Sequence, residues 1–379
     1  MKDLRIAWLL PTAWFYWQPL MNEFTKLFPN TKVFTALFPG FARGLQDSIA
    51  VEIIGQQRKV EFKAESTTYS SHFTYLSPRI VVNLFQFQPQ IIFSSSFGVW
   101  TVLALLFKPI GRWKVIIAYE GSSPTVDYRN SPLRLAIRRA MVRMSDACIS
   151  NSQAGKKYLI EYLKAKPNFV FARPYEVPDI NSWSEFSFDK YDFNGWQKPI
   201  FLFVGKIIPR KGLDVLLKAC ILLKKQGLHN YTILVIGDGE QRVELEAFCQ
   251  EHQIEDRIRW LGKIDYSELG NYFHTANVFV LPTLEDTWGM VVLEAMLCGK
   301  PILCSTEAGA SEIVNEGDNG YCFESSNIKL LAEHMTNFIK EPNLLIKMGE
   351  KSQKIISQHT PEKAANFLSE IVAFVIQTN

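Results

Sequence analysis

Residues 283–301 read TLEDTWGMVVLEAMLCGKP and follow a short apolar run, rich in β-formers, at residues 277–281. The apolar run predicts a buried strand that is ended by Pro282. The segment after it predicts a helix that stops at Gly299, because glycine is favoured just past a helix and Pro301 bars continuation. This stretch therefore predicts a strand, a turn and a helix, which is the repeating unit of an α/β domain.

The predicted helix has features of a ligand site at its start. We expect it to begin near Trp288, with Asp286 or Thr287 as the cap. Gly289 lets a ligand come close to the backbone, and the N–H groups at a helix start bind anions. Glu294 is a carboxylate in an otherwise apolar row, and its burial is costly unless a partner bonds it. The alternative is an ordinary strand-turn-helix in which Glu294 bonds a neighbouring backbone group.

This segment resembles the Glu-x7-Glu signature of the retaining nucleotide-sugar glycosyltransferases of family 4, which have the GT-B fold. In that family the first acid contacts the donor sugar, the helix start binds the diphosphate and the second Glu holds the ribose. Glu294 occupies the second position, and Asp286 occupies the first, where the family has Glu. The resemblance implies that Trp288, Gly289 and Met290 lie at the donor site.

A second motif, FVGKIIPRKGLD at residues 203–214, lies between a predicted strand and a predicted helix. Its cations are placed at the carboxyl end of a strand, where α/β sheets bind ligands, and cations stabilise phosphate charge. On its own this segment could equally be a solvated surface loop. It is similar to the family's Gly-Arg-x4-Lys-Gly pattern, which implies that Gly205, Lys206 and Lys211 bind the diphosphate, with Lys206 in place of Arg.

Two weaker motifs support the same donor site. The turn at residues 237–240 contains Asp238 and Gly239, and its family counterpart lines the nucleotide pocket. A lone Gly-x-Gly is often only a tight turn. Residues 260–264 are similar to a family loop whose backbone meets the base, which implicates Ile264, although simple strand termination is an equal alternative. Glu312, in a partial match further along, is expected to be structural at the start of a helix.

The first half of the chain departs from the family pattern. Glu120 follows a predicted strand at the place where the family often has a His. Glu120 could contact the donor or the acceptor, or it could be an ordinary loop charge. The aromatic residues 14–17 replace a family Gly-Gly loop and could stack on an acceptor sugar or touch a lipid.

Composition narrows the class of protein. The hydrophobic content of 47% and the charged content of 21% are ordinary for a globular chain of 379 residues. A net charge of +3 without a basic-aromatic groove argues against a nucleic-acid partner. The six cysteines form no Cys-x2-Cys pair and the histidines no His-x3-His pair, so we expect reduced thiols, no metal site and a cytoplasmic location. The apolar run at residues 99–107 is about half of what spans a bilayer.

Strand and helix signals alternate along both halves, which predicts parallel sheets. We expect an α/β protein of GT-B architecture, with two Rossmann-like doubly wound domains facing a cleft. Residues 1–180 form the acceptor-side domain, residues 181–198 a linker, and residues 199–360 the nucleotide-sugar domain. Residues 361–379 form a last helix that can pack back on the first domain. In the first half, residues 12–28 read as one helix.

The resemblance implies a retaining, nucleoside-diphosphate-sugar-dependent glycosyltransferase that acts on a hydroxyl of a glycan or lipid-linked acceptor, in bacterial surface-polysaccharide synthesis. We expect no cofactor beyond the sugar nucleotide and no metal, since the chain lacks an Asp-x-Asp motif. The expected catalytic residues are Lys206, Lys211, Asp286 and Glu120. The alternatives are a nucleotide-sugar epimerase and a non-catalytic nucleotide-sugar binder.

Residues 128–145 predict a basic amphipathic helix without acids. We expect its apolar stripe to pack inward; this stripe comprises Leu133, Ile137, Ala140, Met141 and Met144. The remaining surface carries Arg129, Arg134, Arg138, Arg139 and Arg143. That basic surface is expected to be either a solvated face or a peripheral contact with the inner face of a membrane that carries anionic lipid.

Overall fold

The computed structural model describes residues 2–46, 48–56, 58–61, 72–179, 183 and 195–378. The chain divides into two compact units. Unit 1 contains Met1–Lys63, Ser70–Asp179 and His359–Asn379, and unit 2 contains Ile180–Gln358 together with Ala64–Tyr69. Most of the predicted linker, residues 181–198, falls outside the described residues.

Unit 1 is built on a seven-stranded parallel sheet with the order β3-β2-β1-β6-β7-β8-β9. The strands are β1 (Ile6–Leu9), β2 (Thr31–Thr35), β3 (Ala50–Ile53), β6 (Ile91–Ser95), β7 (Lys114–Tyr119), β8 (Ala147–Ser150) and β9 (Val170–Ala172). A separate antiparallel pair consists of β4 (Arg58–Glu61) and β5 (His72–Tyr75). The central strands are mostly apolar and are buried except at Ser95 and Lys114, as expected for a parallel sheet covered on both faces.

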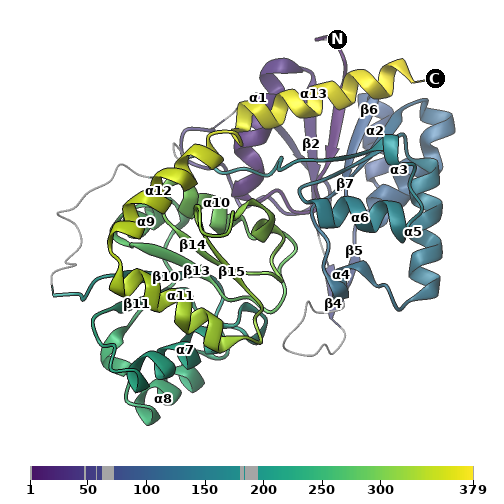
Figure 1. Ribbon diagram of the computed structural model, residues 1–379. Coiled ribbons are helices and arrows are strands. Elements are labelled where there is room, and N and C mark those ends of the chain that lie inside the picture. The colour runs from purple at the N-terminus through teal and green to yellow at the C-terminus, as the bar shows by residue number, and fades with distance from the viewer. Residues whose placement is uncertain are drawn as a thin grey trace. The chain divides into compact units, whose positions relative to one another are not determined.

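The helices of unit 1 cover both faces of this sheet (Figure 1). They are η1 (Phe15–Trp17), α1 (Gln18–Leu27), α2 (Ile80–Phe87), α3 (Val99–Gly111), α4 (Pro124–Asp127), α5 (Pro132–Met144), α6 (Gln153–Glu161), η2 (Pro167–Phe169) and α13 (Pro361–Gln377). The C-terminal helix α13 lies alongside α1 and so completes the N-terminal unit. The single helix predicted over residues 12–28 is wrong, because a 3-10 turn precedes α1 and Pro19 lies in the first turn of α1.

Unit 2 has a six-stranded parallel sheet with the order β12-β11-β10-β13-β14-β15. Its strands are β10 (Ile200–Val204), β11 (Thr232–Ile236), β12 (Ile258–Gly262), β13 (Val278–Leu281), β14 (Ile302–Ser305) and β15 (Gly320–Phe323). The two parallel sheets with their helices confirm the predicted class of two Rossmann-like units.

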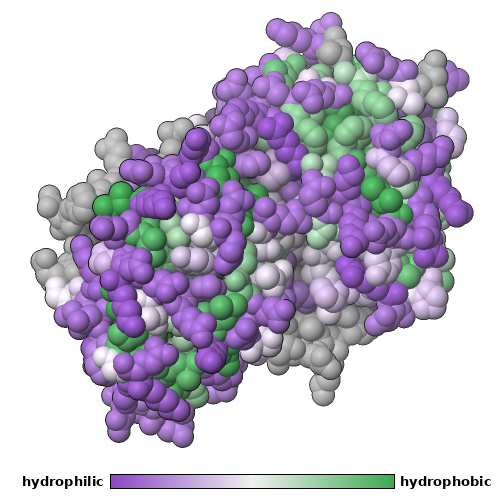
Figure 2. All heavy atoms as spheres, in the orientation of Figure 1, coloured by the Kyte–Doolittle hydropathy of each residue, from purple (hydrophilic) through white to green (hydrophobic). Residues whose placement is uncertain are grey.

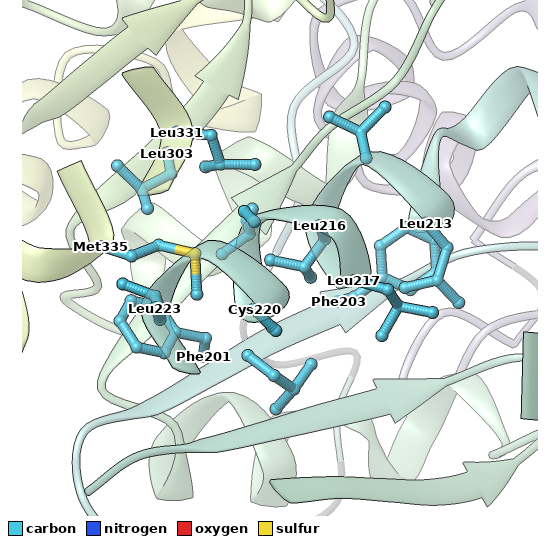
Figure 3. Packing of buried hydrophobic residues seen from close by; sticks show 14 of the residues in the cluster. Phe201, Phe203, Leu213, Leu216, Leu217, Cys220, Leu223, Leu303, Leu331 and Met335 are labelled. Atoms are coloured by element: carbon cyan, nitrogen blue, oxygen red, sulfur yellow. The ribbon is translucent and has the colours of Figure 1, made fainter. Parts of the chain in front are cut away.

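The helices of unit 2 are η5 (Pro209–Lys211), α7 (Leu213–Lys225), α8 (Arg242–Glu251), η6 (Glu255–Arg257), η7 (Tyr266–Glu268), α9 (Leu269–Thr275), α10 (Met290–Leu297), η8 (Gly309–Ile313), α11 (Ile328–Lys340) and α12 (Asn343–Ile356). Figure 3 shows Leu216 and Cys220 of α7 packed with Phe201 of β10 and Met335 of α11. This buried cluster fixes α7, and hence the loop before it, on the sheet.

The predicted orientation of α5 is wrong. The stripe residues Leu133, Ile137 and Met144 are 71%, 48% and 40% exposed. The buried residues of α5 are Leu135, Arg138, Met141 and Val142. A buried arginine turns this face inward: the Arg138 guanidinium donates to the carbonyls of Val126 and Asp127 and to the Tyr158 hydroxyl, at 2.9–3.1 Å. These bonds compensate the burial of its charge, and the apolar stripe is left on the surface.

No helix in the described part of the chain combines the length and apolar character needed to cross a bilayer.

Candidate functional site

The order of the unit 2 sheet creates a switch point between β10 and β13. From β10 the chain proceeds to β11 and β12 on one side, and from β13 it proceeds to β14 and β15 on the other. In open α/β sheets, ligands bind at the carboxyl ends of the strands at such a point. The loop of residues 205–212 follows β10, and the loop of residues 282–289 follows β13. These are the loops that carry the two main sequence motifs.

Hydrogen bonds join these two loops. The Arg210 carbonyl accepts from the Thr283 hydroxyl at 2.9 Å, and the Arg210 guanidinium donates to the Glu285 carbonyl at 2.6 Å. Gly212 has a φ of +65°, and a Cβ there would lie 2.1 Å from the Pro282 carbonyl oxygen. Only glycine fits this backbone conformation and this close approach. Arg210 and Thr283 were not among the predicted site residues, because side chains that join loops leave no periodic signal.

The turn after β11 packs on the loop after β10. A Cβ on Gly237 would lie 1.8 Å from the Gly205 carbonyl oxygen, and Gly239 approaches a neighbouring carbonyl of the same loop almost as closely. The glycines therefore serve a tight backbone contact. Asp238 is exposed, and its carboxylate accepts from the Gly239 N–H at 2.9 Å. Ile264 lies half-buried just beyond the end of β12.

Two of the predicted catalytic residues form an ion pair. The Lys211 ammonium donates to the Asp286 carboxylate, and both side chains are largely buried. Burial acts to raise the pKa of Asp286, but Lys211, the charge of Arg210 and the Trp288 N–H outweigh it and lower that pKa. Lys206 is exposed in the same loop. An ammonium has three donors, so Lys211 can hold Asp286 and still donate to a ligand oxygen.

The helix after the second loop begins later than the sequence predicted. It starts at Met290, and its N-cap residue is Gly289 rather than Asp286 or Thr287. Gly289 has a φ of +96°, which turns the chain sharply before the helix. Gly289, as the N-cap residue, has no side chain that could cap this helix start. Its first N–H groups are therefore oriented as an anion-binding end of a helix.

The short helix η8 holds the loop before α10 in place. The Gly309 N–H donates to the Asp286 carbonyl at 3.1 Å, and the Ala310 N–H donates to the Trp288 carbonyl at 2.6 Å. The helix expected at Glu312 is a 3-10 helix over Gly309–Ile313, with Glu312 exposed in its first turn. The segment after β14 thus fixes the backbone on which Asp286 and Gly289 lie.

Glu294 is buried inside unit 2, on α10. Burial raises its pKa to about 7, and a hydrogen bond with the Tyr266 side chain acts to lower it. Tyr266 lies in η7, after β12, and no sequence motif identified it. A carboxyl group with its pKa raised in this way is partly protonated at neutral pH. It can therefore bond hydroxyl groups of a ligand as donor or as acceptor.

Glu120, the fourth predicted catalytic residue, lies in unit 1 at the carboxyl end of β7. Burial raises its pKa to about 7, while a hydrogen bond with the Ser95 side chain acts to lower it. The pKa of Glu176 is raised well above its ordinary value by burial and by the charge of Glu120. Asn151 accepts from the backbone N–H of Glu176 at 3.0 Å. The sequence singled out Glu120 but not Glu176.

Comparison with known proteins finds a family match over most of unit 2. Residues 186–355 match the family model of glycosyl transferases group 1. This segment contains every predicted site residue except Glu120. An uncharacterized glycosyltransferase of Methanocaldococcus jannaschii is 27% identical over 219 residues, which cover 58% of this chain and 57% of that protein. The chain spans about half the length of the curated relatives it matches.

Solved structures share the fold along almost the whole chain. HepE of Anabaena, in complex with UDP, has a TM-score of 0.75 at 18% identity and covers 98% of this chain and 100% of that chain. WaaG, a glycosyltransferase involved in lipopolysaccharide biosynthesis, has a TM-score of 0.65 at 13% identity and covers 96% of this chain and 99% of that one. At these identities the likeness establishes the GT-B fold, and the chemistry has to be argued from the residues.

Proposed function

We propose that this chain is a retaining glycosyltransferase of family 4 that transfers a sugar from a nucleoside-diphosphate sugar to a hydroxyl group. The observation that carries the proposal is the arrangement at the switch point of unit 2, where a cationic loop follows β10 and a helix with a glycine N-cap and a buried carboxyl follows β13. These are Lys206 and Lys211, the N-terminus of α10 and Glu294. All three groups lie within the segment that matches the glycosyltransferase family model.

In this proposal the donor diphosphate binds the loop lysines and the first N–H groups of α10. Positive groups placed in advance stabilise the negative charge that develops on the leaving diphosphate, and such stabilisation commonly contributes more to rate enhancement than any other effect. Glu294 bonds the ribose hydroxyls. Asp286 contacts the donor sugar from its ion pair with Lys211, and that pair fixes the orientation of both side chains.

The remaining predicted residues take supporting roles. Trp288, Gly289 and Met290 form the helix start against the diphosphate, and Gly205 admits it close to the backbone. Asp238, Gly239 and Ile264 lie at neighbouring strand ends and border the nucleoside. Glu120 bonds a hydroxyl group of a sugar at the unit 1 sheet edge. No divalent metal takes part, because the lysines and the helix dipole supply the electrostatic stabilisation.

We assign the acceptor to the glycans or lipid-linked sugars of surface-polysaccharide synthesis, and the location to the cytoplasm. WaaG, which shares the fold, supports this class, since it is involved in lipopolysaccharide biosynthesis. HepE, which was solved with UDP, supports a nucleotide donor.

A donor panel tests the proposal directly. The full chain is incubated in EDTA with UDP-, GDP- and ADP-sugars and a mixture of glycan acceptors, and products are resolved by mass and by anomeric configuration. The expected result is transfer with retained configuration from one nucleotide class, together with thermal stabilisation by that nucleotide. Lys211→Ala and Glu294→Ala are expected to lower kcat/KM at least tenfold, since a hydrogen bond to a charged group contributes about 1.5–3 kcal/mol.

Three outcomes would contradict the proposal. An epimerised sugar nucleotide without transfer would indicate an epimerase, and stabilisation without any product would indicate a binding protein. Activity lost in EDTA and restored by Mg²⁺ would reject metal independence. Lys218→Ala serves as the control, because Lys218 lies on the exposed side of α7 and pairs only with Asp214 among the described contacts.

A further inference from the structure

Unit 1 carries an exposed apolar face on three of its helices. Among the described residues, seven of the thirteen large hydrophobic side chains that are exposed lie on α2, α3 and α5. We call this set the apolar-basic face; it comprises Val82, Phe85, Leu106, Ile110, Leu133, Ile137 and Met144. Figure 2 shows hydrophobic patches in green between hydrophilic residues in the region of α3 and α5. Apolar side chains scattered singly are normal, but such a concentration indicates a contact surface.

The exposed residues of α5 form one continuous stripe. Leu133, Ile137 and Met144 recur at helical spacing, with about 100° of rotation per residue. Arg134 and Arg143, both exposed, lie about 90° to either side of this stripe. The buried side of the helix is already packed in the core through Leu135, Arg138, Met141 and Val142. The stripe is therefore a second apolar surface, flanked on both sides by arginine.

The helix α3 extends this surface. Leu106 and Ile110 are 59% and 70% exposed, and α3 packs beside α5. The Lys108 ammonium on α3 donates to the Met144 carbonyl at the end of α5, at 2.8 Å. The two apolar stripes thus belong to adjacent helices on one side of unit 1.

The charge around this face is strongly positive. Residues 76–146 contain nine Lys and Arg and three Asp and Glu, a formal balance of +6, whereas the whole chain carries +3. Asp127 is buried and bonded to Arg129, and Asp146 pairs with Lys108 and Lys114. Glu120 lies at the sheet edge. The helices α2, α3 and α5 contain no acid at all.

We propose that the apolar-basic face docks unit 1 on an anionic lipid bilayer. Leu106, Ile110, Leu133 and Ile137 enter the interface between headgroups and acyl chains, while Arg134 and Arg143 bond the lipid phosphates. An amphipathic surface with a basic border binds membranes in this manner, by apolar burial and by attraction to anionic lipid. The charge favours a lipid surface over a second copy of the chain, because two copies of a strongly basic face repel each other. This inference does not depend on the transferase activity proposed above.

Vesicle flotation of the full chain tests the proposal without donor or acceptor. The vesicles contain phosphatidylcholine alone or a mixture with phosphatidylglycerol, at low and at high salt. Binding is expected to the mixed vesicles only, and it is expected to weaken as salt rises from about 0.1 M to 1 M, because the Debye length falls from about 10 Å to 3 Å. Arg143→Gln should weaken partitioning about fivefold and the double variant with Arg134→Gln about 25-fold, as each charge near the surface contributes about 1 kcal/mol.

The apolar stripe is tested by Leu133→Ser together with Ile137→Ser, which is expected to weaken binding at least tenfold. The matched controls are Ile346→Ser on α12 and Lys329→Gln on α11, which are exposed in unit 2 and should leave binding unchanged. Thermal unfolding verifies that each variant folds.

Equal binding to neutral and anionic vesicles, or binding to neither, would overturn the proposal. So would vesicle binding that survives both sets of substitutions. Size-exclusion chromatography tests whether a second copy of the chain binds this face instead. A dimer that Leu133→Ser and Ile137→Ser convert to a monomer would show that the face is a self-interface and would contradict membrane docking.

Discussion

The two units have similar parallel-sheet edges, but the carboxyl groups at these edges have pKa values shifted in opposite directions. In unit 2 the carboxyl edge holds an ion pair, Lys211 with Asp286, and the pKa of Asp286 is lowered. In unit 1 the corresponding edge holds Glu120 and Glu176, and burial raises the pKa of both. The two edges share a parallel architecture, so the difference comes from the side chains placed after the strands.

This difference indicates which kind of ligand each edge suits. A cationic loop beside a helix start with a glycine N-cap stabilises an anion such as a diphosphate. Carboxyl groups with a raised pKa suit uncharged hydroxyl groups as ligands, because a protonated carboxyl group can donate a hydrogen bond as well as accept one. Only the unit 2 edge lies within residues 186–355, which match the glycosyltransferase family model. Substitutions at each edge test this difference between the units.

The largest expected effect comes from breaking the ion pair of unit 2. Lys211→Met leaves the buried Asp286 carboxylate without its ammonium partner, and removing one member of a buried pair costs about 3 kcal/mol or more. The double variant Lys211→Met with Asp286→Leu should recover part of this loss, since no charge is then left alone. Urea denaturation measures the free energy of unfolding of each variant.

The exposed pair of Lys218 with Asp214 provides the matched control, and Lys218→Met should cost less than about 1 kcal/mol. An equal loss of unfolding free energy in Lys211→Met and Lys218→Met would show that burial at the sheet edge adds nothing to the strength of the Lys211 pair.

The second effect concerns Glu294 and pH. Its pKa is raised from 4.5 to about 7. Between these two pH values the folded state therefore holds a proton that the unfolded state has already released. The free energy of unfolding should therefore fall as pH rises from about 4.5 to 7, by roughly 2–3 kcal/mol from this residue. Glu294→Gln should match the wild type near pH 4.5 and exceed its stability at pH 8.

Thermal unfolding at both pH values checks this sign, with Glu244→Gln on the exposed side of α8 as the control. A Glu294→Gln variant less stable than the wild type at pH 8 would mean that the carboxylate is held as an anion.

The third effect tests the unit 1 edge and is smaller, because Glu120 is only half-buried. Glu120→Gln removes a carboxyl whose pKa is about 7 and also a like charge near Glu176. We expect about 1–2 kcal/mol of added stability at pH 8 and none at pH 4.5. Denaturation curves at these two pH values measure it, and a loss of stability at pH 8 would place a cationic partner at this edge.

The smallest effect concerns Asp238 in the turn after β11. Its carboxylate is 61% exposed and lies 3.9 Å from Arg242, and exposed pairs of this kind contribute little. Asp238→Asn should change the free energy of unfolding by less than about 0.5 kcal/mol. A melting temperature that falls as far as that of Lys211→Met would contradict this ranking.

The strand and helix alternation of unit 2 could be predicted from sequence, because its strands are short apolar runs ended by glycine, proline or polar loops. The burial of Glu294 was also predictable, as a lone acid in an apolar helix. The ion pair of Lys211 with Asp286 was not, since 75 residues separate its members in the chain. Tyr266 was missed for the same reason.

The sequence was least informative where two faces of a helix look equally apolar. On α5, Met141 was grouped with Leu133 and Ile137 on the inward stripe, but only Met141 is buried. Arg138 is buried instead, because carbonyls of α4 and Tyr158 accept its bonds. Tertiary hydrogen bonds of this kind override the helical pattern, and no count of apolar residues reveals them. Strand β3 was also missed, since its residues are exposed or half-buried.

Hydrogen–deuterium exchange of the full chain with and without UDP, in EDTA, tests the central claim most directly. A diphosphate on the cationic loop and on the start of α10 should slow exchange of the amides at residues 205–212 and 288–292. Exchange at residues 119–122 and 174–177 of the unit 1 edge should change little. Protection confined to the unit 1 edge, or saturating UDP binding without protection of either unit 2 segment, would contradict the account.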